Sequence, residues 1–91
     1  MNYTFSSEAE KDMKKIKRKD PQLYAGIGKK LALFEKDSKH PSLRLHELVG
    51  NLQNMYSISV TMSIRMIYLL YEKEENFAIF IHIGTYEEVY K

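Results

Sequence analysis

Residues 55–86, MYSISVTMSIRMIYLLYEKEENFAIFIHIGTY, decide the fold of this chain. Ile, Val, Tyr, Phe and Met, which suit a pleated and buried surface, dominate three runs in this stretch. The three predicted strands cover residues 55–61, 64–71 and 77–83. The links between them, residues 62–63 and 72–76, are short enough for hairpins. We therefore expect a three-stranded antiparallel meander.

One cation, Arg65, lies inside this apolar block. A charge in the middle of a sheet must be paired, or it must face a surface where an anion binds. Alternation along residues 55–61 bears on where such a surface lies. It predicts that Tyr56 and Ile58 share one face with Val60, and that Ser57 shares the other with Ser59. We expect the apolar face to meet helices and the hydroxyl face to look away from them.

The N-terminal half predicts one short strand and two helices. Asn2–Phe5 alternates apolar and polar residues and is of edge-strand length. Ser7 and Glu10 form a capping-box pattern, which predicts a helix beginning at Glu8. Asp20 followed by proline predicts the start of a second helix, because Asp is a good N-cap and Pro fits the first helical position.

The second predicted helix has an apolar stripe and ends near Asp37, ahead of Pro41. The stripe consists of Leu23, Ile27, Leu31 and Phe34. Two glycines, Gly26 and Gly28, interrupt the helix, and each costs roughly 1 kcal/mol relative to Ala. We expect these small residues to allow close contact with a neighbouring element.

The element order predicts an α+β fold in one domain over residues 1–91: an N-terminal strand, a helical hairpin and the antiparallel meander. The helical hairpin has an apolar stripe that needs a sheet face to cover. Residues 42–54 are predicted to be a connection with a turn at residues 50–51.

Composition and charge limit the possible classes of protein. With 44% hydrophobic residues a packed core is possible, and the absence of cysteine excludes disulfides and thiolate chemistry. No run of 18 apolar residues and no signal-peptide pattern occur, so we expect a soluble cytoplasmic protein without a membrane partner. Residues 1–46 hold 11 Lys/Arg against 6 Asp/Glu. This basic half could meet nucleic acid or an acidic protein, or it could be an ordinary solvated surface.

Four motifs occur in the C-terminal half: HELVG at residues 46–50, YSISVT at 56–61, IRMIY at 64–68 and IGTYEEVY at 83–90. Together they resemble the RelE/ParE superfamily of bacterial toxins, especially the YafQ-like branch of the ribosome-dependent mRNA interferases. The first, third and fourth are similar to that family's H-x-L-x-G, R-[LIM]-[IV]-Y and I-G-T-H-x-x-V-Y patterns. The resemblance implies the βααβββ order of the RelE-like fold.

The resemblance also implies a reaction and partners. Toxins of this kind cut mRNA in the ribosomal decoding site, where the ribose 2′-hydroxyl attacks the neighbouring phosphate without a metal or a small-molecule cofactor. The implied partners are the ribosome with its rRNA, the mRNA, and a cognate antitoxin. The chemistry needs a group that takes the 2′-hydroxyl proton, a group that stabilises phosphate charge, and a group that protonates the leaving oxygen.

Arg65 matches the family's strand arginine, which implies that it stabilises the phosphate. A guanidinium suits this role because it is always charged and offers planar paired donors. The alternative is a structural ion pair with Glu87 or Glu88. His46 matches the motif histidine and could act as acid or base near neutrality. The alternative is a loop histidine that only packs or caps.

Two positions depart from the family pattern. Tyr86 replaces the histidine of I-G-T-H, and a tyrosine with the ordinary pKa of about 10 is a poor base at pH 7. It could still donate a proton, orient the phosphate or stack on a base. Ser63 stands where relatives often carry Asp. These departures keep open a catalytically weak or inactive protein that only binds its antitoxin. A ParE-like toxin that binds DNA gyrase is a further alternative.

Other candidate RNA contacts are weaker. Ser57, Ser59 and Ser63 could bond ribose or phosphate, although polar alternation explains the first two equally well. Tyr90 matches a C-terminal aromatic that packs beside substrate, or it closes the core. The resemblance implies that the basic run of residues 11–19 contacts rRNA. The candidates in that run are Lys14, Lys15 and Arg18.

The histidines do not predict a metal site. His40, His46 and His82 lack zinc-type spacing, and no cysteine could complete a site. A lone strand histidine such as His82 is more often a packing residue than a ligand.

Overall fold

The computed structural model of the protein describes residues 1–48, 54–72 and 76–85. The elements, in chain order, are β1 (Asn2–Phe5), α1 (Ser7–Lys19), α2 (Pro21–Lys36), a 3-10 turn η1 (Pro41–Leu43), β2 (His46–Glu47), β3 (Met55–Ser59), β4 (Ile64–Glu72) and β5 (Asn76–Thr85). The predicted α+β class and the order strand, helical hairpin, meander are confirmed. The short strand β2, inside the predicted connection, was not expected. The predicted turn at residues 50–51 lies outside the described residues.

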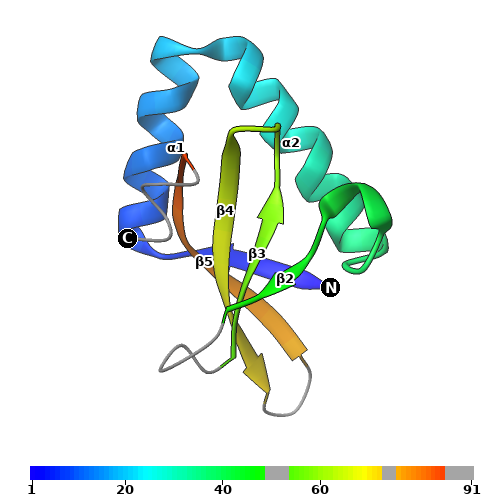
Figure 1. Ribbon diagram of the computed structural model, residues 1–91. Coiled ribbons are helices and arrows are strands. Elements are labelled where there is room, and N and C mark those ends of the chain that lie inside the picture. Colours follow the sequence, from blue (N-terminus) through cyan, green and yellow to red (C-terminus); the bar gives the residue numbers. More distant parts are fainter. Residues whose placement is uncertain (49–53, 73–75, 86–91) are drawn as a thin grey trace.

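The five strands form one sheet in the order β1-β5-β4-β3-β2. The predicted meander is its centre, because β4 pairs antiparallel with both β3 and β5. β1 adds parallel to the outer side of β5, and β2 adds antiparallel to β3. Figure 1 shows α1 and α2 meeting above the β3–β4 turn, with the end of β5 beside α1. The sheet therefore joins both ends of the described chain.

The helices cover one face of the sheet through a core of apolar side chains. Ile27, Leu31 and Phe34 of α2 pack with Ile58 and Val60, as the alternation predicted. Tyr56 is partly buried against the same core. No helix of the described ranges is long and apolar enough to cross a membrane.

The start of α1 differs from the prediction by one residue. The helix begins at Ser7, and the N-cap is Ser6, whose Oγ accepts a hydrogen bond from the Ala9 backbone N–H at 3.1 Å. The predicted box of Ser7 and Glu10 is therefore not the cap. The Ser6 N–H donates to the Phe80 carbonyl at 2.9 Å, which ties this end of the helix to β5. That tie requires an extended backbone at Ser6, as found in N-cap residues.

The start of α2 follows the prediction. Asp20 is its N-cap, and one carboxylate oxygen accepts from the Leu23 N–H at 3.0 Å. The helix ends at Lys36, beside the predicted stop at Asp37.

The expectation that the two glycines allow close packing is wrong. A Cβ added at Gly26 or Gly28 would have no heavy atom within 4 Å, apart from its chain neighbours and the backbone of its own helix turn. These positions therefore face open space, and the glycines weaken the helix without improving its packing.

Replacing Gly28 by Ala should stabilise the protein by about 0.5–1 kcal/mol, because alanine loses less backbone entropy in a helix. Thermal and denaturant unfolding of Gly28→Ala measure the change. Ala25→Gly, at an exposed position of the same helix, is the matched reverse substitution and should destabilise by a similar amount. Equal stability of Gly28→Ala and the parent chain would contradict the conclusion that Gly28 weakens the helix without improving its packing.

Aromatic rings form the centre of the core. Phe80 lies 5.3 Å from Phe34 and 5.4 Å from Tyr68 between ring centroids, both in edge-on arrangements. Tyr68 also stacks on Tyr56 at 5.5 Å. Phe34 and Phe80 have no exposed surface, and Tyr68 is 2% exposed. This cluster joins α2 to the three central strands.

Burial raises the pKa of Tyr68 to about 12, with a smaller contribution from Tyr56. The unfolded chain ionises this phenol near its ordinary value of 10, whereas the folded chain holds the proton to higher pH. The contribution of the neutral Tyr68 phenol to the free energy of unfolding is therefore complete below pH 10. It is lost as the pH rises from 10 to about 12. We expect Tyr68→Phe to show a weaker loss of stability over this alkaline range than the parent chain, measured by urea unfolding at each pH.

A β-bulge at Ile81 changes which side chains of β5 face the core. Tyr68 pairs with Phe80 and Ile67 pairs with His82, so Ile81 has no partner in the β4–β5 ladder. Ala78, Phe80 and Ile83 are all core residues, although two-residue alternation from Phe80 would have placed His82 there. The bulge thus removes a histidine from the core and puts Gly84 opposite Arg65.

Candidate functional site

The candidate site is built on the face of the sheet that lies away from the helical core. Arg65 is near the start of β4, where it pairs with Ser59 of β3 and Gly84 of β5. Its guanidinium extends over the neighbouring row, in which Ser57 pairs with Ile67. Arg65 therefore lies on the hydroxyl face that alternation predicted for Ser57 and Ser59.

Three hydrogen bonds from the described residues hold the Arg65 guanidinium. Nε and Nη2 both donate to the Oγ of Ser57, at 3.1 and 3.0 Å, and Nη2 also donates to the backbone carbonyl of Arg44 at 2.9 Å. Ser57 has no exposed surface, so the guanidinium is anchored to a buried hydroxyl. These bonds fix both the position and the plane of the charged group.

The remaining donors of Arg65, at Nη1, have no hydrogen-bond partner among the described residues. No carboxylate within those ranges forms an ion pair with Arg65, since the ion pair found there joins His82 to Asp12. Glu87 and Glu88, the acidic partners considered from the sequence, lie outside the described residues. Arg65 therefore offers an oriented positive charge to an anion.

His46 belongs to the edge strand β2 and pairs with Ser57. Direct cross-strand partners project to the same face of a sheet, so His46 flanks the serine that holds Arg65. His46 is exposed, and it is not without an interaction partner in the folded chain. Ser57 therefore links the two candidates, as the strand partner of His46 and the hydrogen-bond acceptor of Arg65.

The Ser57 and Ser59 hydroxyls both form hydrogen bonds within the protein. Ser57 is buried under Arg65, so it does not present its hydroxyl at the surface. The Ser59 hydroxyl donates to the Thr61 carbonyl at 2.8 Å and stabilises the hairpin. The Ser57 hydroxyl accepts from Arg65 in this structure, and direct bonding of RNA by either serine stays a prediction.

Ser63 lies in the turn of the β3–β4 hairpin, directly before β4. Its backbone N–H donates to the Oγ1 of Thr61 at 3.2 Å. It lines an open pocket of about 470 Å³ with Asp20 and Gln22, at the junction of the two helices. A contact of Ser63 with RNA stays a prediction.

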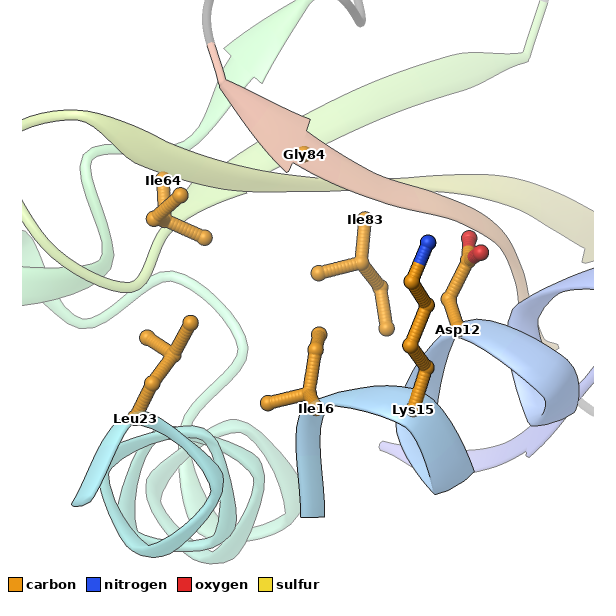
Figure 2. Close-up of a pocket in the computed structure, with 7 residues that line it drawn as sticks. All are labelled: Asp12, Lys15, Ile16, Leu23, Ile64, Ile83 and Gly84. Carbon is orange, nitrogen blue, oxygen red and sulfur yellow. The ribbon is translucent and has the colours of Figure 1, made fainter. Parts of the chain in front are cut away.

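The three cations predicted on α1, Lys14, Lys15 and Arg18, are all exposed. Figure 2 shows Lys15 with Asp12 at the edge of a pocket of about 230 Å³ between the helices and the ends of β4 and β5. Gly84, the cross-strand partner of Arg65, also lines this pocket. The basic helix is thus next to the strand that completes the candidate site.

His82 is oriented toward α1 rather than packed in the core. Its Nδ1 lies 3.9 Å from a carboxylate oxygen of Asp12, too far for a direct hydrogen bond but close enough for an ion pair when the imidazole is protonated. That carboxylate oxygen is buried and has no hydrogen-bond partner among the described residues. Sequence patterns gave no signal for this pair, because the bulge at Ile81 sets the direction of His82.

Tyr86 and Tyr90, the remaining predicted site residues, lie outside the described residues. Within the described ranges, no three His, Cys, Asp or Glu side chains are grouped closely enough to hold a metal ion. The described part of the site is therefore an arginine that a serine hydroxyl and a backbone carbonyl hold in place, with a histidine on the neighbouring strand. Such an arrangement suits a phosphate group.

The fold has close counterparts among solved structures, although no protein-family model and no curated protein matches the sequence. The YoeB/ParE toxin from Agrobacterium tumefaciens superposes with a TM-score of 0.79 at 14% identity, over 94% of this chain and 99% of that one. YafQ from E. coli strain BL21(DE3) gives 0.77 at 16% identity, over 99% and 98%.

A third counterpart is the E. coli DinJ-YafQ toxin-antitoxin complex, with a TM-score of 0.76 at 18% identity over 99% of this chain and 97% of that one. Likeness at these identities establishes the fold. The RelE-like fold expected from the motifs is therefore confirmed, with the YafQ and YoeB/ParE structures as its counterparts.

Proposed function

We propose that this protein is the toxin of a type II toxin–antitoxin pair and cleaves mRNA on the ribosome. The observation that carries the proposal is the Arg65 guanidinium, held by Ser57 and the Arg44 carbonyl with its Nη1 donors unengaged among the described residues. The fold shared with YafQ and with the DinJ-YafQ toxin-antitoxin complex supports it. The C-terminal motifs of the sequence add the expectation of an mRNA substrate.

The proposed reaction is a transesterification within the RNA, in which the phosphorus exchanges one oxygen for another. The 2′-oxygen bonds to phosphorus and the bond to the 5′-oxygen breaks, giving a 2′,3′-cyclic phosphate and a 5′-hydroxyl. Arg65 stabilises the charge that accumulates on the phosphate oxygens. His46 and Tyr86 are the groups proposed to take the proton from the 2′-hydroxyl and return one to the 5′-oxygen.

The proposed site of action is the ribosome in the cytoplasm. The exposed α1 cations Lys14, Lys15 and Arg18 support binding to ribosomal RNA. Contacts of this kind with phosphate weaken as the salt concentration rises. The proposed protein partner is a cognate antitoxin, by analogy with the DinJ-YafQ complex. Antitoxin binding over the Arg65 face would block the site.

The direct test adds purified protein to ribosomes programmed with a defined mRNA and maps the products by primer extension. We expect cuts at a fixed phase within codons and a 2′,3′-cyclic phosphate at the new 3′ end. The same mRNA without ribosomes is the control and should remain uncut. Gyrase-dependent DNA cleavage without mRNA cuts would indicate the ParE-like alternative, and a folded protein with neither activity would indicate an antitoxin-binding protein only.

A further inference from the structure

Arg44 has an unusual backbone conformation next to the candidate site. Its φ of 47° and ψ of 53° lie in the left-handed region, which disfavours side chains other than glycine, asparagine and aspartate. The other non-glycine residue with positive φ among those described is Asn54, a type that tolerates it. A strained arginine beside a site needs a physical reason.

Contacts on both sides hold Arg44 in this conformation. Its N–H donates to the Pro41 carbonyl at 3.1 Å and closes the 3-10 turn η1, and Leu43 before it has no exposed surface. Two residues later, His46 enters β2 and pairs with Ser57. The left-handed residue is therefore the corner at which the chain turns from η1 into the edge strand.

The same corner directs a carbonyl at the site. The Arg44 oxygen accepts a hydrogen bond from Arg65 Nη2 at 2.9 Å, across 21 residues of sequence. Ser57 holds one edge of the guanidinium through Nε and Nη2. The carbonyl adds a second anchor on Nη2, so the guanidinium plane is set and Nη1 is directed away from both partners.

We propose that Arg44 is a positioning residue whose left-handed backbone orients Arg65 for phosphate and places His46 beside it. Its effect on catalysis rests on the proposed function, whereas its effect on Arg65 does not. The backbone conformation, and not the Arg44 charge, is the property that matters. Substitutions that share the loss of charge but differ in tolerance of positive φ therefore separate the two.

The test compares Arg44→Gly, Arg44→Ala and Arg44→Val. All three remove the charge, and the left-handed conformation becomes less favourable from Gly to Ala to the β-branched Val. The first readout is the ¹⁵N–¹H signal of the Arg65 Nε–H in the free protein. We expect a resolved, slowly exchanging signal in the parent chain and in the Gly variant, and a signal at the position of solvent-exposed arginines in the Val variant.

The second readout is the cleavage rate on programmed ribosomes. We expect the Val variant to be about tenfold slower than the Gly variant, which corresponds to a left-handed penalty of about 1.4 kcal/mol. Should the Val variant fail to fold, the Gly and Ala pair carries the same comparison with a smaller difference. Identical Nε–H signals in all folded variants would overturn the proposal.

The two readouts also separate this inference from the proposed function. If the Arg65 signal follows the series but no protein cleaves mRNA, Arg44 positions Arg65 and the proposed reaction is wrong. If the parent chain cleaves mRNA and both readouts are flat across the series, the reaction stands and the positioning role is wrong.

Discussion

Arg65→Ala is expected to lower the rate of mRNA cleavage on the ribosome by about 10²–10³-fold, because removing one preorganised donor to a developing oxyanion has an effect of this size. The donor group is preorganised here, since Ser57 and the Arg44 carbonyl hold it at 3.0 and 2.9 Å before substrate arrives. Single-turnover cleavage of a defined mRNA, quantified by primer extension, measures the change. A parent-like rate in a folded Arg65→Ala protein would remove Arg65 from the mechanism.

Arg65→Lys is a more selective variant for the same site. Lysine keeps the charge but lacks the planar guanidinium. In Arg65 that group donates to Ser57 through Nε and Nη2, and its Nη1 donors remain for phosphate. We expect a rate between those of the parent chain and Arg65→Ala. Equal rates for Arg65→Lys and the parent would show that charge alone is sufficient and that the hydrogen-bonded orientation is unimportant.

Loss of Arg65 also removes two hydrogen bonds to the buried Ser57 hydroxyl, so stability needs its own control. A hydrogen bond of this kind contributes roughly 0.5–1.5 kcal/mol to stability. The double variant Arg65→Ala with Ser57→Ala removes both partners and should recover part of that stability. Its rate should remain as low as that of Arg65→Ala, which separates the catalytic loss from the folding loss. Lys29→Ala, at an exposed position on α2, is the matched removal of a cation and should leave the rate unchanged.

The faces of the central strands could be predicted from the sequence because they depend only on alternation. Ile58 and Val60 face the core, and Ser57 faces Arg65, as the period of two requires. The N-cap at Asp20 was equally predictable, since an Asp-Pro pair fits one position of a helix start. These features are local, and local chemistry determines them.

Other features depend on strand register or on backbone groups, and no sequence pattern predicted them. The bulge at Ile81 reverses the alternation of β5, so His82 faces Asp12 and not the core. The Arg44 carbonyl that holds Arg65 is a backbone group, which every residue carries. Two adjacent serines, Ser6 and Ser7, fit an N-cap equally well, and the hydrogen bond from Ser6 to Phe80 decides between them.

Phe80→Ala is expected to destabilise the fold by about 3–5 kcal/mol, the usual cost of removing a fully buried phenylalanine. Its ring meets Tyr3 at 5.7 Å and Phe34 at 5.3 Å, so the cavity would open between β1, β5 and α2. For a domain of this size each kcal/mol lowers the midpoint by roughly 4–8 °C. Differential scanning calorimetry and urea unfolding measure the loss.

Phe77→Ala is the matched control, because it removes the same side chain from the same strand on the opposite face. Phe77 is partly buried and meets Tyr71 at 5.0 Å, a tyrosine that is 38% exposed. We expect a loss of about 1 kcal/mol there, since little apolar surface returns to water. Equal losses for Phe77→Ala and Phe80→Ala would contradict a core confined to the helical side of the sheet.

The Phe80 variant also tests how the core supports the site. Phe80 is the last residue of β5 to pair before the bulge at Ile81, and the register beyond it places Gly84 opposite Arg65. Phe80→Leu keeps most of the volume and should cost less than about 1.5 kcal/mol. A Phe80→Leu protein that is folded but has lost the held Arg65 Nε–H signal would show that the ring fixes the bulge. An unchanged signal would show that the Ser57 and Arg44 contacts hold the guanidinium without help from the core.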